Sequence, residues 1–147
     1  MKYLSIILIC ASIIFIHCAS TGKKGFSQYG QSRIIEAEYN DVFQATLNHF
    51  RDLGYTIKST DWDSGKIETD YKKRDRGTFR YYDRRSRIRA EVVKMADNQI
   101  KLTLEYFNEI KEDINSSWVA LELNTRDEMA VYDRNFNQIT ERIQSMK

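Results

Sequence analysis

Proline is absent from this sequence of 147 residues, and glycine, cysteine and histidine are scarce, at six, two and two residues. Hydrophobic residues make up 41% of the chain and charged residues 30%, a balance typical of a globular domain. That balance excludes a disordered chain and a multi-pass membrane protein. The 23 basic and 21 acidic residues give a formal charge of only +2. A net charge this small indicates neither a nucleic acid partner nor an acidic substrate. Any electrostatic function therefore depends on where the charges lie.

The scarcity of cysteine and histidine removes most catalytic and metal chemistry. Both cysteines, Cys10 and Cys18, precede the expected domain, so processing at Cys18 leaves no disulfide, thiolate nucleophile or thiolate metal site. His49 is then the one histidine left, and we expect it at the surface or at the edge of the core. The sequence has no glycine-rich phosphate loop and no nucleophile elbow. We therefore expect a protein that is not an enzyme and binds no cofactor or metal.

Two groups of carboxylates come closest to a functional motif. Asp61, Asp63 and Gly65 resemble the start of a calcium-binding loop. The glycine comes one place early, however, and Lys72 stands where a bidentate glutamate is required, so we expect a hairpin turn instead. Residues 109–113 carry the second group, without an apolar pocket that would raise a carboxyl pKa. We expect these to be solvated loop charges.

The first residues have the pattern of an export signal. Lys2 precedes an uncharged apolar run at residues 3–16, which is too short to span a bilayer comfortably and is typical of a signal peptide. Cys18 follows at once, as in lipoprotein signals, where the cysteine becomes the lipid-modified first residue of the mature chain. His17 departs from this pattern, because a small residue usually precedes the cysteine. Cleavage after Ser20, giving a soluble periplasmic protein, and an uncleaved short anchor remain alternatives.

These observations predict three segments. Residues 1–17 are the expected lipoprotein-type signal peptide, residues 18–32 a lipidated N-terminus with a flexible tether rich in Gly, Ser and Gln, and residues 33–147 a single domain. Ala19 follows the cysteine where an acidic residue could stand, and in this the sequence resembles lipoproteins sent to the outer membrane. We expect a lipid-anchored protein of the bacterial cell envelope, at the outer membrane.

Hydrophobic periodicity predicts two helices, at residues 41–53 and 125–146, where apolar residues recur every three or four positions. Asn40 is the expected N-cap and Gly54 the C′ residue of the first helix, and a capping box at residues 125–128 opens the second. Period-two alternation predicts strands at residues 35–39, 55–57, 67–71, 88–92, 100–106 and 119–123, with hairpin turns at residues 61–65 and 96–99.

The order β-α-β-β-(β)-β-β-β-α predicts an α+β fold: an antiparallel sheet of about five to six strands with two helices packed on one face. Residues 39–45, Leu47, residues 53–57, Asp61 and residues 65–69 carry a helix that ends at Gly-aromatic-x-Ile and a hairpin of the form Asp…Gly-x-Ile-x-Thr. This pattern resembles small bacterial envelope lipoproteins. It is similar to the helix-grip domains of the C-type lipoprotein of the outer-membrane β-barrel assembly machinery.

The resemblance covers roughly residues 35–143 in outline, and its specific part is the first helix and the first hairpin. It implies a helix-grip-like fold and a non-catalytic accessory or scaffolding role in the envelope.

One stretch, the basic segment (residues 72–89), departs from the even charge distribution. It holds two acidic residues and three aromatic ones, Phe79, Tyr81 and Tyr82. The basic residues are Lys72, Lys73, Arg74, Arg76, Arg80, Arg84, Arg85, Arg87 and Arg89. Arginine forks bind phosphate and carboxylate, so an anionic partner is one interpretation. The alternation of Arg85, Arg87 and Arg89 with smaller or apolar residues equally suits the solvent face of a strand with intramolecular pairs.

Two functions follow from these patterns. The first is a membrane-anchored envelope lipoprotein that acts as an assembly, scaffolding or accessory module through a protein partner. The alternative is a binder of an anionic envelope ligand, such as lipid or lipopolysaccharide phosphates or cell-wall polymer, through the basic segment. We expect no nucleic acid partner, because an exported protein rarely meets one.

Overall fold

A computed structural model describes residues 30–74, 82–113, 115–121 and 125–146. Its elements, in chain order, are β1 (Gln31–Glu36), α1 (Tyr39–Asp52), β2 (Ile57–Asp61), β3 (Lys66–Thr69), β4 (Lys72–Arg74), β5 (Asp83–Ala96), β6 (Gln99–Lys111), β7 (Val119–Ala120) and α2 (Thr125–Ser145). The predicted α+β class and element order are confirmed. The sheet has seven strands rather than five to six, because the short β4 and β7 also pair within it.

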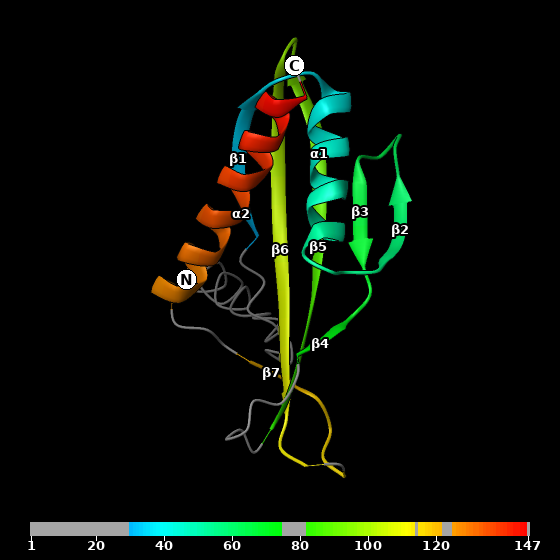
Figure 1. Ribbon diagram of the computed structural model, residues 1–147, viewed down its shortest axis with the longest axis vertical. Helices are drawn as coiled ribbons and strands as arrows, with labels where there is room; N and C mark the ends of the chain where they lie inside the picture. The colour runs from blue at the N-terminus through cyan, green and yellow to red at the C-terminus, as the bar shows by residue number, and fades with distance from the viewer. Residues whose placement is uncertain (1–29, 75–81, 114, 122–124, 147) are drawn as a thin grey trace, which may run out of the picture.

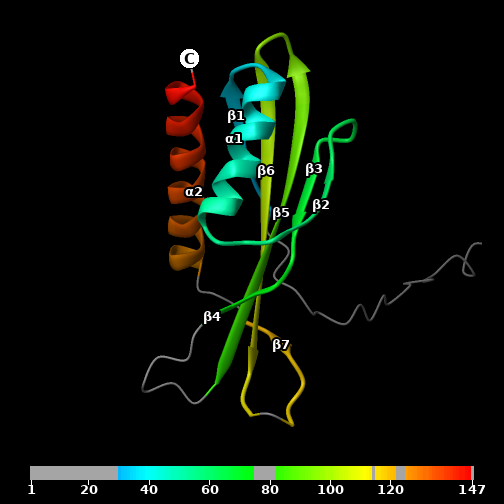
Figure 2. The same cartoon turned by 45° about the vertical axis from the view of Figure 1, so that its right-hand side comes forward.

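All strand pairs are antiparallel, in the order β1-β6-β5-β3-β2, with β4 on β5 and β7 on β6. A long hairpin of β5 and β6 forms the spine of the sheet, from the pair Asp83↔Lys111 to the pair Ala96↔Gln99. Both helices cover one face of its upper half, and the lower half extends beyond them, flanked by β4 and β7 (Figures 1 and 2). We call the opposite sheet face, which neither helix covers, the outer face.

The core lies between the helices and the upper half of the sheet, because one set of alternating residues on each strand is apolar. Ile88, Ala90 and Val92 of β5 face the helices and are buried. Buried side chains from the helices and from β6 complete this core: Phe43, Phe50, Ile100, Leu102, Leu104, Tyr132, Phe136, Ile139 and Ile143. The hydrophobic periodicities in the sequence therefore predict most of the residues of this core.

The start of α1 differs from the prediction. The helix begins at Tyr39, with Glu38 as an N-cap that makes no side-chain bond, so the prediction of Asn40 as N-cap is wrong. Tyr39 belongs to the helix rather than to a strand because its ring packs on Phe43, one turn further along, and its hydroxyl donates to Trp62 O at 2.6 Å. At the other end Gly54 has φ +75°, as predicted for a C′ residue.

Two other boundaries differ as well. β1 begins at Gln31, two residues inside the segment predicted as tether (residues 18–32), because its pairing with β6 extends to Leu104. β7 ends at Ala120, and the expected strand residue Leu123 lies outside the described residues, as do residues 1–17 and Cys18. Among the described helices, none is long and apolar enough to cross a membrane.

Candidate functional site

The basic segment lies along β4 and the lower half of β5, where strand alternation sends its residues to both faces of the sheet. Arg85, Arg87 and Arg89 project from the outer face, because they alternate with Ser86 and with the buried Ile88. Their cross-strand partners on β6 are Glu109, Phe107 and Glu105. The basic segment therefore divides its side chains between the two faces of the sheet, with these three arginines together on the outer face.

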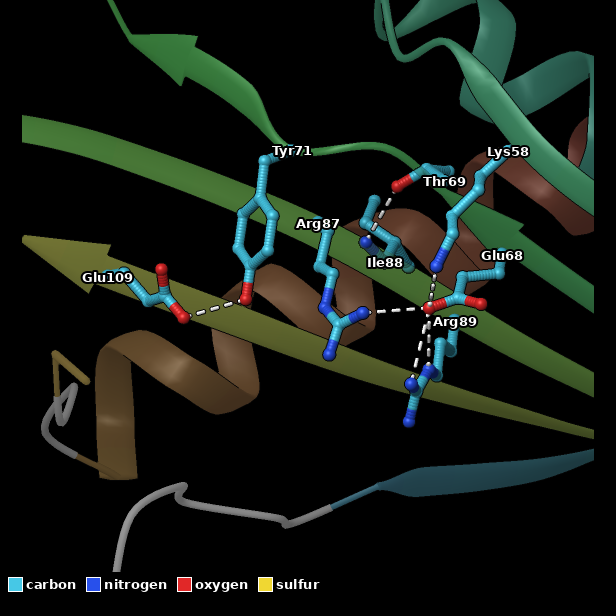
Figure 3. Close-up of polar contacts among 8 residues, drawn as sticks. All are labelled: Lys58, Glu68, Thr69, Tyr71, Arg87, Ile88, Arg89 and Glu109. Carbon is cyan, nitrogen blue, oxygen red and sulfur yellow. Dashed lines mark hydrogen bonds and ion pairs between the residues drawn. The ribbon is translucent and has the colours of Figure 1, made fainter. Parts of the chain in front are cut away.

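The carboxylate of Glu68, on the adjacent strand β3, contacts two of these arginines and Lys58 of β2. Glu68 Oε1 accepts hydrogen bonds from Arg87 Nη1 at 2.7 Å and from Arg89 Nε and Nη2, both at 3.2 Å (Figure 3). Lys58 Nζ lies 3.5 Å from the same oxygen. Burial alone would raise the pKa of Glu68, but the hydrogen bond from Arg89 and the nearby positive charges hold it below its usual value.

Glu109 forms the second centre of the outer face. Its carboxylate accepts a hydrogen bond from Tyr71 OH at 2.7 Å and one from Arg85 Nε at 2.5 Å, and only 7% of the residue is exposed. Burial raises the pKa of Tyr71, as does its bond to Glu109. The prediction that Glu109 is a solvated loop charge is wrong, because β6 continues to Lys111 and turns this residue toward Arg85. Glu112 and Asp113 are exposed, as predicted.

The same guanidinium groups lie over aromatic rings. Arg85 Cζ is 4.2 Å from the ring centroids of both Tyr71 and Trp118. Arg87 Cζ is 4.5 Å from the Phe107 centroid and 5.1 Å from that of Tyr71. Phe107 is 4% exposed although it lies on the face away from the helices. Arginine stems and guanidinium planes therefore cover an aromatic layer here, and each such contact contributes roughly 0.5–2 kcal/mol.

The remaining residues of the basic segment are divided between the two faces. Lys73 pairs in register with Arg85, whereas Lys72 and Arg74 pair with Ser86 and Arg84 on the helix side. Lys72 Nζ donates to Leu53 O at 2.5 Å, so this charge binds the end of α1. The other two predicted site residues, Arg76 and Arg80, lie outside the described residues, together with Phe79 and Tyr81.

The two buried polar side chains at the helix interface, His49 and Asn135, are more enclosed than predicted. His49 is 4% exposed and its Nε2 donates to Asn135 Oδ1 at 2.7 Å. Asn135 Nδ2 in turn donates to Val131 O at 2.6 Å, which fixes the amide orientation. Burial lowers the pKa of His49 below its usual value. The pair satisfies both polar groups, so it has a structural explanation.

The segment around Asp61 forms the predicted hairpin turn. Asp61 Oδ1 accepts the backbone N–H of Ser64 at 3.1 Å, and Gly65 has φ +69°. Within the described parts of the chain, no group of three or more His, Cys, Asp or Glu side chains is arranged to hold a metal ion.

The sequence analysis missed the acidic and aromatic partners of the arginines. Glu68 alternates with the buried Ile67 and Thr69, and this alternation already places it on the outer face. The pairing of β3 with β5, which brings Glu68 beside Arg89, cannot be predicted from any local sequence pattern. The same holds for Tyr71 and Trp118, which reach Arg85 from separate segments.

Comparisons with known proteins name no function. No protein-family model matches the chain, and no curated protein matches it. Among solved structures, the chain is similar to the crystal structure of a conserved protein from Geobacillus kaustophilus, with 12% sequence identity and a TM-score of 0.37. The match covers 78% of this chain and 91% of that chain. At that TM-score the similarity carries no argument about fold or function.

Proposed function

We propose that the chain is a non-catalytic lipoprotein of the bacterial cell envelope, anchored in a membrane through Cys18, that acts as an assembly, scaffolding or accessory module. The anchor part of this proposal rests on the uncharged apolar run, the cysteine that directly follows it and the resemblance to envelope lipoproteins. We propose the outer face as the surface that contacts a protein partner.

The observation that carries the proposed contact surface is that the three outer-face arginines are already paired with carboxylates and largely covered. Arg85, Arg87 and Arg89 each have a carboxylate partner, and the side chains of Arg85 and Arg87 are only 26% and 18% exposed. A phosphate group would have to compete with Glu68 and Glu109 for their N–H donors. Arginine planes packed on Tyr, Phe and Trp rings match the composition of protein interfaces, where these residue types dominate binding energy.

An apolar row at the upper end of the outer face supports the same conclusion. Ile34 and Val93 pair in register with Lys101 from either side, so the three side chains lie next to one another across β1, β6 and β5. Ile34 is 64% exposed and Val93 38%. The proposed partner therefore presents an apolar patch bordered by carboxylates, which complements this row and its lysine.

Site-specific photocrosslinking in intact cells tests the contact surface. A benzophenone side chain at Val93 should form an adduct of one discrete mass, whereas the same probe at the exposed Gln138 of α2 should form none. Substitution of Ile34→Glu should reduce the Val93 adduct, since it places a carboxylate on the apolar row. Equal labelling from both probes, or an adduct indifferent to Ile34→Glu, would contradict the proposed surface.

Salt dependence separates this function from the anionic-ligand alternative. Association through an apolar row should change little between low and high ionic strength, whereas phosphate binding by the basic segment should weaken steeply. Replacement of Lys73, an exposed residue of β4 in the basic segment, by Glu should weaken phosphate binding and leave the crosslink from Val93 in place. Loss of that crosslink in a variant that still folds would favour the alternative.

A further inference from the structure

A cavity of about 170 Å³ lies on the helix side of the lower half of the sheet, on the face opposite to the proposed contact surface. Figure 2 shows this region, below α1 and beside the start of α2. Tyr55 follows α1, Tyr132 comes from α2, and β4, β5 and β6 supply the remaining walls. Its lining includes Tyr55, Arg74, Arg84, Ser86, Tyr106 and Tyr132, and two carboxylates, those of Glu109 and Glu128, also border it.

Two arginines of this cavity oppose each other across neighbouring strands, and neither forms an ion pair within the described residues. Arg74 and Arg84 are Cα partners in the β4–β5 register, and both line the cavity. Like charges directly opposite on neighbouring strands destabilise a sheet. Among the described residues, no ion pair joins either arginine to a carboxylate. Arg84 Nη2 donates to Tyr82 OH at 3.2 Å, but Arg84 Nε is buried and has no acceptor.

A buried hydroxyl that lines the same cavity also lacks a partner. Tyr106 OH makes no hydrogen bond, whereas the neighbouring hydroxyls of Tyr55 and Ser86 bond each other at 2.7 Å. Burial raises the pKa of Tyr106, so its hydroxyl keeps its proton and remains a donor. Unsatisfied buried donors are rare in folded proteins and call for a specific explanation. Both donors belong to residues that line the cavity, so a ligand with several acceptor oxygens would supply the acceptor that each of them lacks.

We propose that this cavity binds the phosphate group of a small ligand, with Arg74 and Arg84 as the charged contacts and Tyr106 as a neutral donor. Guanidinium forks match phosphate oxygens, and a dianion between two arginines removes their mutual repulsion. Glu128 also lines the cavity and leaves one net positive charge among the three groups. The volume is below the roughly 300–1,000 Å³ of pockets for drug-sized ligands, so it suits a headgroup-sized molecule. The site shares Arg85 and Glu109 with the outer face, where these two side chains pair with each other.

Calorimetric titration of the full chain in nonionic detergent tests the site, with inorganic phosphate, glycerol 3-phosphate and short-chain phosphatidylglycerol as probes at constant ionic strength. Wild type should bind at least one of them saturably. Arg84→Met should weaken that binding about 10- to 100-fold, the usual loss for a hydrogen bond to a charged group. Arg134→Met, which removes one exposed charge from α2, should leave the binding unchanged.

Melting temperature without ligand separates a binding role from a structural one. Arg84→Met should melt at or above the wild-type temperature, since it removes repulsion from Arg74, and Tyr106→Phe should do the same, since it removes an unsatisfied hydroxyl. Tyr106→Phe should also weaken phosphate binding. A marked fall in melting temperature in both variants would mean that these groups are structural, and would overturn the proposal.

The three probes distinguish the source of the phosphate. Tighter binding of the short-chain lipid than of glycerol 3-phosphate identifies a lipid headgroup, and the reverse order identifies a free phosphorylated metabolite. Binding that is equal in wild type and Arg84→Met places the anion elsewhere, and absence of binding by all three probes excludes a phosphate site. Either result overturns the proposal and leaves the contact function of the outer face untouched.

Discussion

At the residue scale, the buried histidine of α1 is the group most sensitive to mild acid. His49 lies between the helices as a donor to Asn135, and burial keeps its pKa below 6.5. Below about pH 6.5 the unfolded chain therefore binds a proton that the folded chain does not. The buried, neutral His49 therefore costs no stability above that pH. The free energy of unfolding falls as the pH drops from about 6.5 toward the folded pKa of His49.

We accordingly expect the free energy of unfolding to fall between pH 7 and pH 5 in urea titrations, with a smaller fall in His49→Gln. Glutamine keeps an N–H donor for Asn135 but does not titrate, so it is a matched control. Equal pH dependence of wild type and His49→Gln in this window would show that His49 is not the responsible group.

The second residue-scale prediction concerns Glu68, which contacts Lys58, Arg87 and Arg89 together. Because its folded pKa lies below the usual value, its contribution to stability is present at neutral pH and is lost as the pH falls below about 4.5. Glu68→Gln removes the charge and leaves three cations close together. We expect a loss of about 1–2 kcal/mol at pH 7 in urea unfolding.

Glu91→Gln is the control for Glu68, because Glu91 lies on the same face of the sheet and is exposed. Its substitution should change stability by less than about 0.5 kcal/mol. Similar losses in the two variants would indicate that general surface charge, and not the arginine contacts of Glu68, determines the effect.

At the element scale, the hairpin of β2 and β3 docks on β5 through a glycine. Gly65 has φ +69°, its carbonyl accepts the N–H of Val92 at 2.9 Å, and a Cβ at this position would lie 2.0 Å from Val92 O. Alanine would therefore strain the turn and push the hairpin from the sheet. We expect Gly65→Ala to lower the free energy of unfolding by about 2–3 kcal/mol.

Gly54→Ala provides the comparison, since Gly54 has a similar φ of +75° but a Cβ there would meet only the flexible end of Lys72. Its cost should be about 1–2 kcal/mol, from the left-handed conformation alone. A Gly65→Ala variant no less stable than Gly54→Ala would show that the turn adjusts without moving the hairpin.

Element types were accessible from the sequence wherever periodicity was strong. Phe43, Leu47 and Phe50 identify α1, and the alternation from Ile88 to Val92 identifies the core strand β5. The start of α1 at Tyr39 could not be predicted from the sequence, because it depends on a hydrogen bond from Tyr39 to Trp62, a residue in a later turn. The arrangement of the outer face could be predicted only in part from the sequence. Alternation indicates which way Arg87 points, but Phe107 and Glu68 become its neighbours through strand pairing between distant segments.

At the scale of the whole molecule, the testable property is attachment to a membrane. We expect Cys18→Ala to move the protein from the membrane pellet to the aqueous fraction, since each acyl chain contributes roughly 0.8 kcal/mol per buried CH₂. Mass spectrometry of the native mature N-terminus is the direct measurement, with an acylated Cys18 as the expected result. An unmodified N-terminus near Thr21 would contradict the anchor and make a freely diffusing periplasmic protein the better hypothesis.

The length of the β5–β6 hairpin bears on the order in which the chain folds. Its tightest pair, Ala96↔Gln99, closes a very short loop, and pairing then extends outward to Asp83↔Lys111 without any contribution from distant segments. β1 must find the same strand β6 from far away in the sequence, as in the pair Ile35↔Ile100, and pays a larger loop-closure entropy. Amides of the hairpin should therefore become protected before those of β1 in pulsed hydrogen exchange during refolding. The opposite order would mean that helix docking, rather than the hairpin, nucleates the domain.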